Sequence, residues 1–183
     1  ACAQLAAWKN AGLHPGRIAV NVSALQLRDQ RLLQVLPELM RTYGLQSDEL
    51  ELELTESTLM SDSEAAQATV ASLRGFGVSL AIDDFGTGYN SLAQLNSLPI
   101  DQIKIDKSFV DNILTDERAL KLNKAIMLIA KTMALEIVAE GIEYQEQGNT
   151  MNELGCDQGQ GYWYSRPLPL PTLLDWLKTH KLP

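Results

Sequence analysis

The chain has 183 residues, of which 45% are hydrophobic, and a formal net charge of −8. This length can bury one sizeable core and predicts one domain, while the acidic balance argues against binding to nucleic acid polymers or anionic membranes. No apolar run approaches the roughly 20 residues of a membrane-spanning helix, and two isolated cysteines predict neither a disulfide framework nor a zinc site.

Short β-branched runs alternate with longer amphipathic runs, which predicts parallel strands joined by helices. The chain starts inside an apparent helix, at residues 1–12. The expected strands are 17–22, 51–56, 78–84, 100–106 and 136–143, with a weaker one near 159–164. The expected helices are 24–43, 63–74, 90–97, 115–134, 144–154 and 171–179. Gly44 and Gly75 follow two of these helices and predict C-terminal caps.

The fold class that follows is α/β, with about six strands. A closed (β/α)8 barrel needs eight strands and typically about 250 residues. The pattern therefore predicts either an open, doubly wound sheet or a barrel whose first two strands are missing. The chain does not begin with Met, so we expect it to be a piece of a longer protein.

Alternate residues of a strand face opposite sides of a sheet, and five of the expected strands share one pattern. One face is apolar and suits an outer layer of helices. The opposite face is small or polar and becomes charged toward the C-terminal end of each strand. Active sites of α/β sheets and barrels lie at that end, so we expect the functional site there.

The polar residues expected at this edge of the sheet offer oxygen ligands only. They are Asn21, Glu53, Asp83, Asp84 and Glu140. Such donors suit Mg²⁺, Mn²⁺ or Ca²⁺, and the adjacent Asp83 and Asp84 suggest two ions with Asp83 between them. Two ions about 4 Å apart stabilise both oxygens of an in-line phosphoryl displacement. Lys104 is the cation on the same face of the expected strands and would hold water or a phosphate oxygen.

Each of these residues also has a purely structural interpretation. Asn21 could cap the next helix, and Glu53 could face solvent on an edge strand. Lys104 could form a structural ion pair with Asp106, and Glu140 could cap a helix. Their coincidence at matching ends of consecutive strands favours one shared site.

Six stretches resemble, in order, motifs of the EAL-domain family: AVNVSALQL, LELTES, IDDFGTGYNSL, IDQIKIDKSFV, VAEGIE and QGYWYSRPLP. The resemblance covers essentially the whole chain, and six ordered motifs are far more specific than one short pattern. It implies a single EAL-type domain over residues 1–183 with a modified (β/α)8 barrel. It also implies a bacterial cyclic di-GMP phosphodiesterase that forms linear pGpG with two Mg²⁺ or Mn²⁺ ions, Ca²⁺ being inhibitory.

The resemblance implies a role for each matching residue. Asn21, Glu53 and Asp83 match ligands of the first metal, and Asp83, Asp84 and Glu140 match ligands of the second. The remaining matches are the catalytic residues Lys104, beside the attacking water, and Glu140, as general base; the loop-stabilising Glu56, on a loop linked to dimerisation; and the substrate-binding Asp106, Glu143, Gln160, Ser165 and Pro167, the last two at the guanine pocket.

One departure from the family pattern is large, because the Glu-Ala-Leu motif itself is absent. Its Glu is a first-metal ligand on a strand that would precede Ala1. We therefore expect an active parent protein and an impaired fragment that associates through open sheet edges. For the parent we expect a cytoplasmic domain, and the sequence leaves open whether a GGDEF or sensor domain, a membrane anchor and a homodimer accompany it.

Two other functions remain open at this point. The first is a catalytically inactive receptor that binds cyclic di-GMP, although such relatives usually lose metal ligands or the loop glutamate. The second is a barrel enzyme of different metal chemistry, such as an enolase-like lyase. That enzyme would explain Asp, Glu and Lys at strand ends but not the DDFGTG and SRPLP segments.

Overall fold

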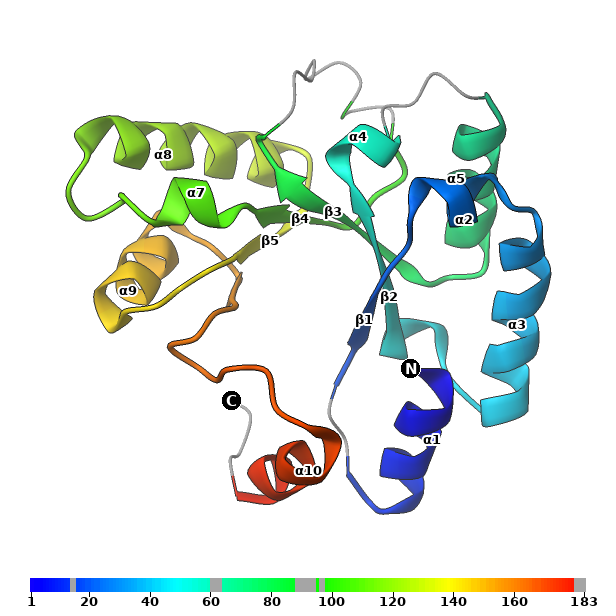
Figure 1. Cartoon of the computed structure of the whole chain (residues 1–183). Helices are drawn as coiled ribbons and strands as arrows, with labels where there is room; N and C mark the ends of the chain where they lie inside the picture. The colour runs from blue at the N-terminus through cyan, green and yellow to red at the C-terminus, as the bar shows by residue number, and fades with distance from the viewer. Residues whose placement is uncertain (14–15, 60–63, 88–94, 96–97, 180–183) are drawn as a thin grey trace.

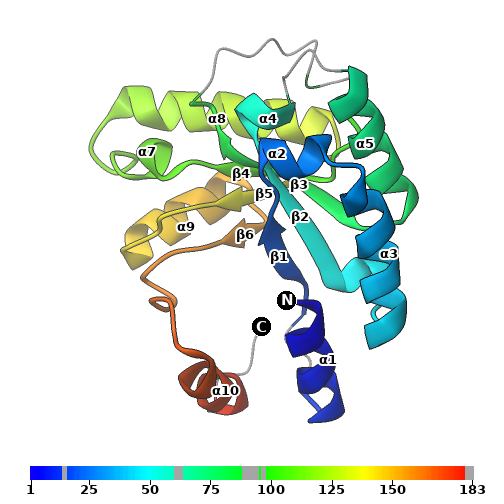
Figure 2. The ribbon, with the colours of Figure 1, turned by 45° about the vertical axis from the view of Figure 1, so that its right-hand side comes forward.

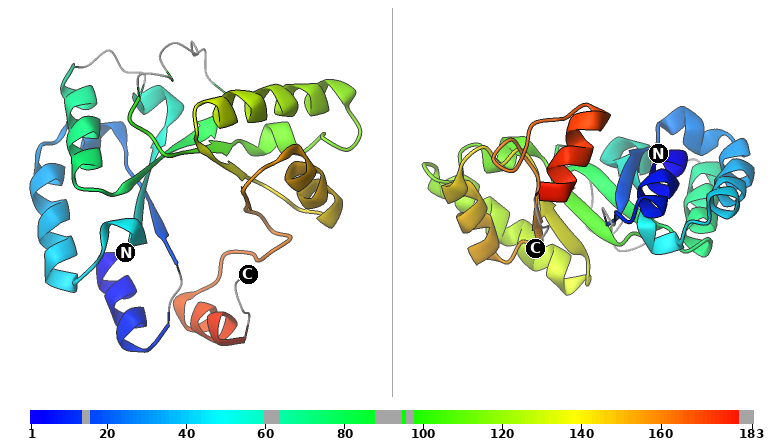
Figure 3. Two further views of the ribbon diagram at one scale, coloured as in Figure 1. Left: turned by 180° about the vertical axis from the view of Figure 1, so that it is seen from behind. Right: turned by 90° about the horizontal axis from the view of Figure 1, so that it is seen from below.

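A computed structural model describes residues 1–13, 16–59, 64–87, 95 and 98–179. Its six strands form one parallel sheet in which each strand pairs with the next along the chain. The strands are β1 (Ile18–Asn21), β2 (Leu50–Thr55), β3 (Ser79–Phe85), β4 (Gln102–Ile105), β5 (Glu136–Ala139) and β6 (Gln158–Gly159). The sheet curls into a half-barrel, as Figure 1 and the two views of Figure 3 show. The curl confirms the barrel type of α/β fold rather than a flat, doubly wound sheet.

The helices of the described residues are α1 (Cys2–Asn10), α2 (Ala24–Arg28), α3 (Arg31–Tyr43), α4 (Glu56–Leu59), α5 (Glu64–Gly75), α7 (Lys107–Val110), α8 (Glu117–Thr132), α9 (Gln145–Leu154) and α10 (Leu170–Thr179). Of these, α3, α5, α8 and α9 lie around the outside of the half-barrel, whereas α1 and α10 lie below the sheet in the views of Figure 1 and Figure 2. A short 3₁₀ turn, η1 (Ser47–Glu49), precedes β2. No helix in the described part of the chain is long and apolar enough to cross a bilayer.

The predicted alternation of strand faces is confirmed. The outward side chains Leu54, Leu80, Ile103 and Ile137 are no more than 1% exposed and belong to the main hydrophobic core. Burying each such side chain contributes about 1.5–3 kcal/mol, which fixes the sheet against its helices. Because the side-chain period is two, the same register turns the polar residues toward the concave side.

Several expected boundaries differ from the structure. The helix expected over 24–43 is two helices, because Asp29 is extended and accepts hydrogen bonds from the backbone and side chain of Arg31. Gly44 is the left-handed cap that was predicted, with φ 62°. The helix expected to stop before Gly75 includes it, and Gly77 takes the left-handed turn with φ 82°.

Other differences concern the second half of the chain. The expected strand 136–143 stops pairing at Ala139, and the weak strand expected near 159–164 is the two-residue β6. The short helices α4 and α7 were not predicted. The helix expected over 90–97 lies outside the described residues, apart from residue 95.

Within the described residues, β1 and β6 each pair along one edge only. The gap between them faces α1 and α10, which meet where Leu173 and Leu174 pack against the buried Leu5 and Trp8. The concave side of the sheet lines a cavity whose polar lining includes Glu53, Lys104 and Gln160 but not Asp83, Asp84 or Glu140.

Candidate active site

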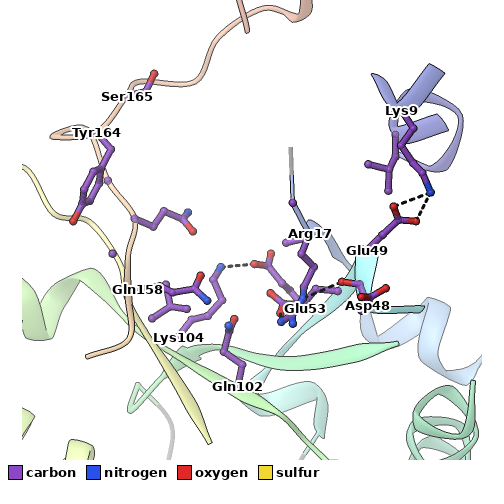
Figure 4. A pocket seen from close by; sticks show the side chains of 18 residues that line it. Lys9, Arg17, Asp48, Glu49, Glu53, Gln102, Lys104, Gln158, Tyr164 and Ser165 are labelled. Atoms are coloured by element: carbon purple, nitrogen blue, oxygen red, sulfur yellow. Dashed lines mark hydrogen bonds and ion pairs between the residues drawn. The ribbon is translucent and has the colours of Figure 1, made fainter. Parts of the chain in front are cut away.

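Lys104 lies at the centre of the polar cluster on the concave side of the sheet. Its side chain projects from β4 and is 5% exposed. Its Nζ atom is 2.6 Å from Glu53 Oε1, 2.9 Å from Asp83 Oδ1 and 2.7 Å from Glu140 Oε1. These carboxylates come from the ends of β2, β3 and β5, and Figure 4 shows the contact with Glu53. The predicted convergence of strand ends is confirmed for these four residues.

Asp83, Asp84 and Glu140 form an acidic trio whose nearest carboxylate oxygens all lie within 4.8 Å of one another. The backbone explains how two consecutive aspartates can face one site. Asp84 adopts a left-handed conformation with φ 55°, which Asp tolerates better than most residues, and the β3–β4 register shifts between Ile82 and Phe85. The trio offers the hard oxygen donors that Mg²⁺ and Mn²⁺ prefer.

The electrostatics show an excess of negative charge at this cluster. Burial raises the pKa of Glu140, as do Asp83 and Glu53, while Lys104 opposes the rise. Burial also raises the pKa of Asp84, with Asp83 and Asp106 adding to it. Burial lowers the pKa of Lys104, but hydrogen bonds to Glu140, Glu53 and Asp83 raise it by more than burial lowers it. The net pKa is raised, so the ammonium keeps its proton. One cation thus faces four carboxylates, an arrangement that favours additional bound cations.

Two other predicted site residues flank the cluster. Asn21 ends β1 opposite Glu53 in the sheet register, which places it on the concave face, and it is exposed. Glu56 begins α4, is 3% exposed and accepts a hydrogen bond of 2.9 Å from the Gly86 amide. That bond ties Glu56 to the loop after β3, which is the contact a loop-stabilising glutamate requires.

The predicted substrate-binding residues divide into two groups. Asp106 and Glu143 are occupied locally: Asp106 caps α7 by accepting from the Ser108 amide, and Glu143 pairs with Lys107. Gln160 and Ser165 line the cavity inside the half-barrel, and Pro167 lines a smaller cavity that also touches both of them.

The cavity inside the half-barrel has a volume of about 790 Å³ and is lined by Glu53 and Lys104 as well as by residues near the start of the strands (Figure 4). Among the latter, Arg17 was not singled out from the sequence. It contacts Glu51 Oε2 at 2.9 Å, Ser79 Oγ at 3.1 Å and Glu136 Oε2 at 3.6 Å. An arginine opening a strand with a polar inner face was the available signal for this second cluster.

Comparison with known proteins identifies the family. Residues 1–167 match the EAL domain. The chain belongs to the EAL-domain family. It is 41% identical over 179 residues to the oxygen sensor protein DosP of Escherichia coli, and 40% identical over 181 residues to the cyclic di-GMP phosphodiesterase NbdA of Pseudomonas aeruginosa. These alignments cover 98% and 99% of this chain but only 22% and 23% of the two relatives.

Solved EAL domains share the fold. The EAL domain of Mycobacterium smegmatis DcpA superposes with a TM-score of 0.92 at 34% identity, over 100% of this chain and 82% of that one. The PaMucR phosphodiesterase in complex with c-di-GMP gives 0.88 at 38% identity, over 94% and 70%. Klebsiella pneumoniae BlrP1, in a complex with manganese and cy-diGMP, gives 0.82 at 26% identity, over 91% and 43%. The EAL half-barrel described above is therefore part of a fold seen with cyclic dinucleotide bound.

Proposed function

We propose that this EAL domain belongs to a cyclic di-GMP phosphodiesterase that forms linear pGpG with two divalent cations, Mg²⁺ or Mn²⁺. The observation that carries the proposal is the acidic trio of Asp83, Asp84 and Glu140 beside the buried Lys104. The relatives supply the substrate class, since their names and complexes include cyclic di-GMP. An enolase-like lyase has no comparable support.

The residues present fit a pair of cations. Asp83, Asp84 and Glu140 bring their oxygens close enough to share one ion, and the register of β1 puts Asn21 next to Glu53 for a second. Asp83 would serve both. Bound there, two cations would stabilise the charge on the attacking and leaving oxygens of the phosphoryl displacement. They would also offset the repulsion between an acidic cavity and the phosphates of the substrate.

The chain's own residues would then manage water and its proton. Glu140 is buried enough for its pKa to be raised, which improves it as an acceptor for the proton of the attacking water. Lys104 keeps its charge and would donate a hydrogen bond that orients this water or a phosphate oxygen. Glu56 would hold Gly86, at the start of the loop that directly follows Asp83 and Asp84 of β3.

The other predicted residues would bind the nucleotide. Gln160 and Ser165 face the cavity and Pro167 lies beside them, so they would line the guanine site. Asp106 and Glu143 would act beside the site, Asp106 lying near enough to Asp84 for its charge to raise the pKa of that carboxyl. These assignments follow the family resemblance together with the placement of each side chain.

The experiment is incubation with cyclic di-GMP and Mg²⁺ or Mn²⁺, followed by chromatography of linear pGpG. It uses the 183-residue chain and, in parallel, the chain extended upstream of Ala1 by a segment with the Glu-Ala-Leu motif. We expect product from the longer chain that disappears with a chelator and with Asp83→Asn. The shorter chain should be slower because β1 and β6 are open edges. Binding of cyclic di-GMP without product from either chain would instead support the receptor function.

The relatives' lengths bear on partners, since this chain spans under a quarter of DosP and NbdA. We propose that the parent protein combines the EAL domain with a sensor or GGDEF domain and acts as a homodimer. Light scattering of the longer chain tests the dimer, and a monomer at micromolar concentration would contradict it. A cytoplasmic location remains an expectation from the sequence.

A further inference from the structure

Helix α7 (Lys107–Val110) contacts Gly86, which directly follows β3, the strand that carries Asp83 and Asp84. The ring of Phe109 lies directly against Gly86, and a Cβ atom placed on Gly86 would be 2.7 Å from the Phe109 Cζ atom. Gly86 has φ 97°, a conformation that glycine adopts without strain. The Glu56 carboxylate accepts the Gly86 N–H, so Gly86 is held by Glu56 and by the Phe109 ring.

The same helix contacts the segment after β5, next to Glu140. The aliphatic stem of Lys107 crosses Gly141, and a Cβ atom placed there would be 2.6 Å from the Lys107 Cβ atom. Gly141 also has a left-handed backbone, with φ 71°. Beyond the stem, the Lys107 ammonium pairs with Glu143 and Asp111. One four-residue helix therefore packs against the neighbours of Asp84 and of Glu140.

Two buried amide side chains fix α7 in place. Asn123 of α8 is 0% exposed and donates from Nδ2 to the Phe109 carbonyl at 2.8 Å. Gln147 of α9 is 2% exposed and donates from Nε2 to the Val110 carbonyl at 3.4 Å. These bonds satisfy carbonyls that a helix of one turn cannot satisfy internally. Helix α7 is thus anchored to α8 and α9 through its backbone.

The acidic trio needs such an anchor because its members repel one another. Asp83 and Glu140 contact Lys104, but one ammonium cannot neutralise all three carboxylates of the trio. Like charges at this separation repel and push the ends of β3 and β5 apart. A metal site binds well only when its ligands are already held near their final positions. The contacts of Phe109 and Lys107 oppose that spreading on both sides of the trio.

We propose that α7 is a clamp that sets the separation of the β3 and β5 ends, with Phe109 and Lys107 as positioning residues for the cation ligands. The consequence for cations rests on the proposed function, whereas the clamp itself does not. Outer contacts of metal ligands typically change metal affinity 10–100-fold when they are removed. We therefore expect Phe109→Ala to weaken Mn²⁺ binding about tenfold.

The experiment compares Phe109→Ala with Leu73→Ala in the full chain. Leu73 is 0% exposed on α5, near the helix end that leads into the start of β3, so it controls for general destabilisation. Hydrogen exchange of the metal-free protein is read at the amides of Gly86 and Glu140, which donate to Glu56 and to the Ile105 carbonyl. We expect both amides to exchange at least tenfold faster in Phe109→Ala than in Leu73→Ala, when the two variants are compared at the same free energy of unfolding.

The second arm titrates the same variants with Mn²⁺ and follows the free ion by electron paramagnetic resonance. Lys107→Met keeps an unbranched stem over Gly141 and should bind Mn²⁺ within threefold of wild type, whereas Lys107→Ala should lose several-fold. Gly86→Ala should reduce Mn²⁺ affinity less in a Phe109→Ala background than in wild type, because the ring that the new Cβ atom would meet is gone.

The two arms separate the clamp from the proposed function. If Leu73→Ala matches Phe109→Ala in both exchange and Mn²⁺ affinity, the clamp is wrong. If Lys107→Met and Lys107→Ala bind Mn²⁺ equally, the role of the Lys107 stem is wrong. If wild type neither binds Mn²⁺ nor hydrolyses cyclic di-GMP, yet Phe109→Ala still frees both amides, the proposed function fails and the clamp stands.

Discussion

Two clusters inside the half-barrel place a cation among carboxylates, and they differ in charge balance. At the carboxyl ends of the strands, the ammonium of Lys104 faces Glu53, Asp83 and Glu140, with Asp84 close by. At the opposite end, the guanidinium of Arg17 faces two carboxylates, those of Glu51 and Glu136. Arg17 also contacts neutral groups, whereas the contacts of Lys104 just named are all with carboxylates.

The difference indicates which cluster is built for a ligand. Arg17 also donates to the Asp48 carbonyl and to Ser79 Oγ, so its fork of donors is shared among neutral and charged acceptors. Four carboxylates around one ammonium leave an excess of three negative charges, whereas two around one guanidinium leave one. The first cluster gains from added cations, and the second is an internal brace.

The largest expected effect is on the rate of hydrolysis, which should fall when the Lys104 cluster is changed but not when the Arg17 cluster is changed. Asp83→Asn in the longer chain should reduce hydrolysis of cyclic di-GMP at least a hundredfold, because Asp83 would contact both cations. Glu136→Gln makes the same carboxylate-to-amide change in the Arg17 cluster and should leave the rate within threefold. Initial rates of pGpG formation at saturating Mn²⁺ measure both. Equal losses in the two variants would remove the distinction between the clusters.

A second prediction concerns stability without metal. Lys104→Met leaves three buried or half-buried carboxylates without their shared cation, and breaking a buried ion pair from one side costs about 3–5 kcal/mol. Urea unfolding of the chelated protein should show this loss. Saturating Mn²⁺ should restore part of it, since added cations replace the missing charge. A variant as stable as wild type in chelator would contradict the central role of Lys104.

Arg17→Met should have a smaller effect on stability. Glu51, which is 7% exposed at its side chain, would lose its cationic partner but keep the hydrogen bond from Ser79 Oγ, and Arg17 itself is 34% exposed, so solvent screens the pair. We expect a loss of roughly 1–2 kcal/mol in urea unfolding. Added Mn²⁺ should not recover it, in contrast to Lys104→Met. Recovery with Mn²⁺ would show that the Arg17 cluster also takes cations.

The sequence predicted the Lys104 cluster because one simple rule reaches it. Period-two alternation within strands places Glu53 and Lys104 on the concave face, and parallel pairing brings the strand ends together. The same rule places Glu51 and Ser79 on the concave face beside Arg17, but at the start of the strands, where no active site is expected. The contact of Phe109 with Gly86 does escape the rule, because Phe109 lies on a one-turn helix and meets Gly86 across 23 positions of the chain.

Local chemistry explains the boundary errors in the same way. The expected helix over 24–43 had continuous leucine spacing, but Asp29 bonds the Arg31 backbone and stops the first helix. Such side-chain bonds compete with helix propagation and are weak signals in a single sequence. The four-residue α7 is too short for a periodic pattern, and its anchors Asn123 and Gln147 come from distant helices.

The smallest expected effect concerns Cys156, a buried group outside the Lys104 cluster. It tests whether burial alone can raise a pKa. Burial raises the pKa of the Cys156 thiol to about 11 from 9.0, against hydrogen bonds with the backbone of Gln158, Ala139 and Asp157 that lower it. A thiol whose folded pKa is raised stabilises the fold below its unfolded pKa, and that stability is lost as pH rises through 9 toward 11. The difference in unfolding free energy between wild type and Cys156→Ala should shrink by about 1 kcal/mol between roughly pH 8 and pH 10. Parallel stability curves for the two proteins would mean that burial alone does not hold the proton. The raised pKa values of Glu140 and Asp84 would then have to be attributed to their charged neighbours.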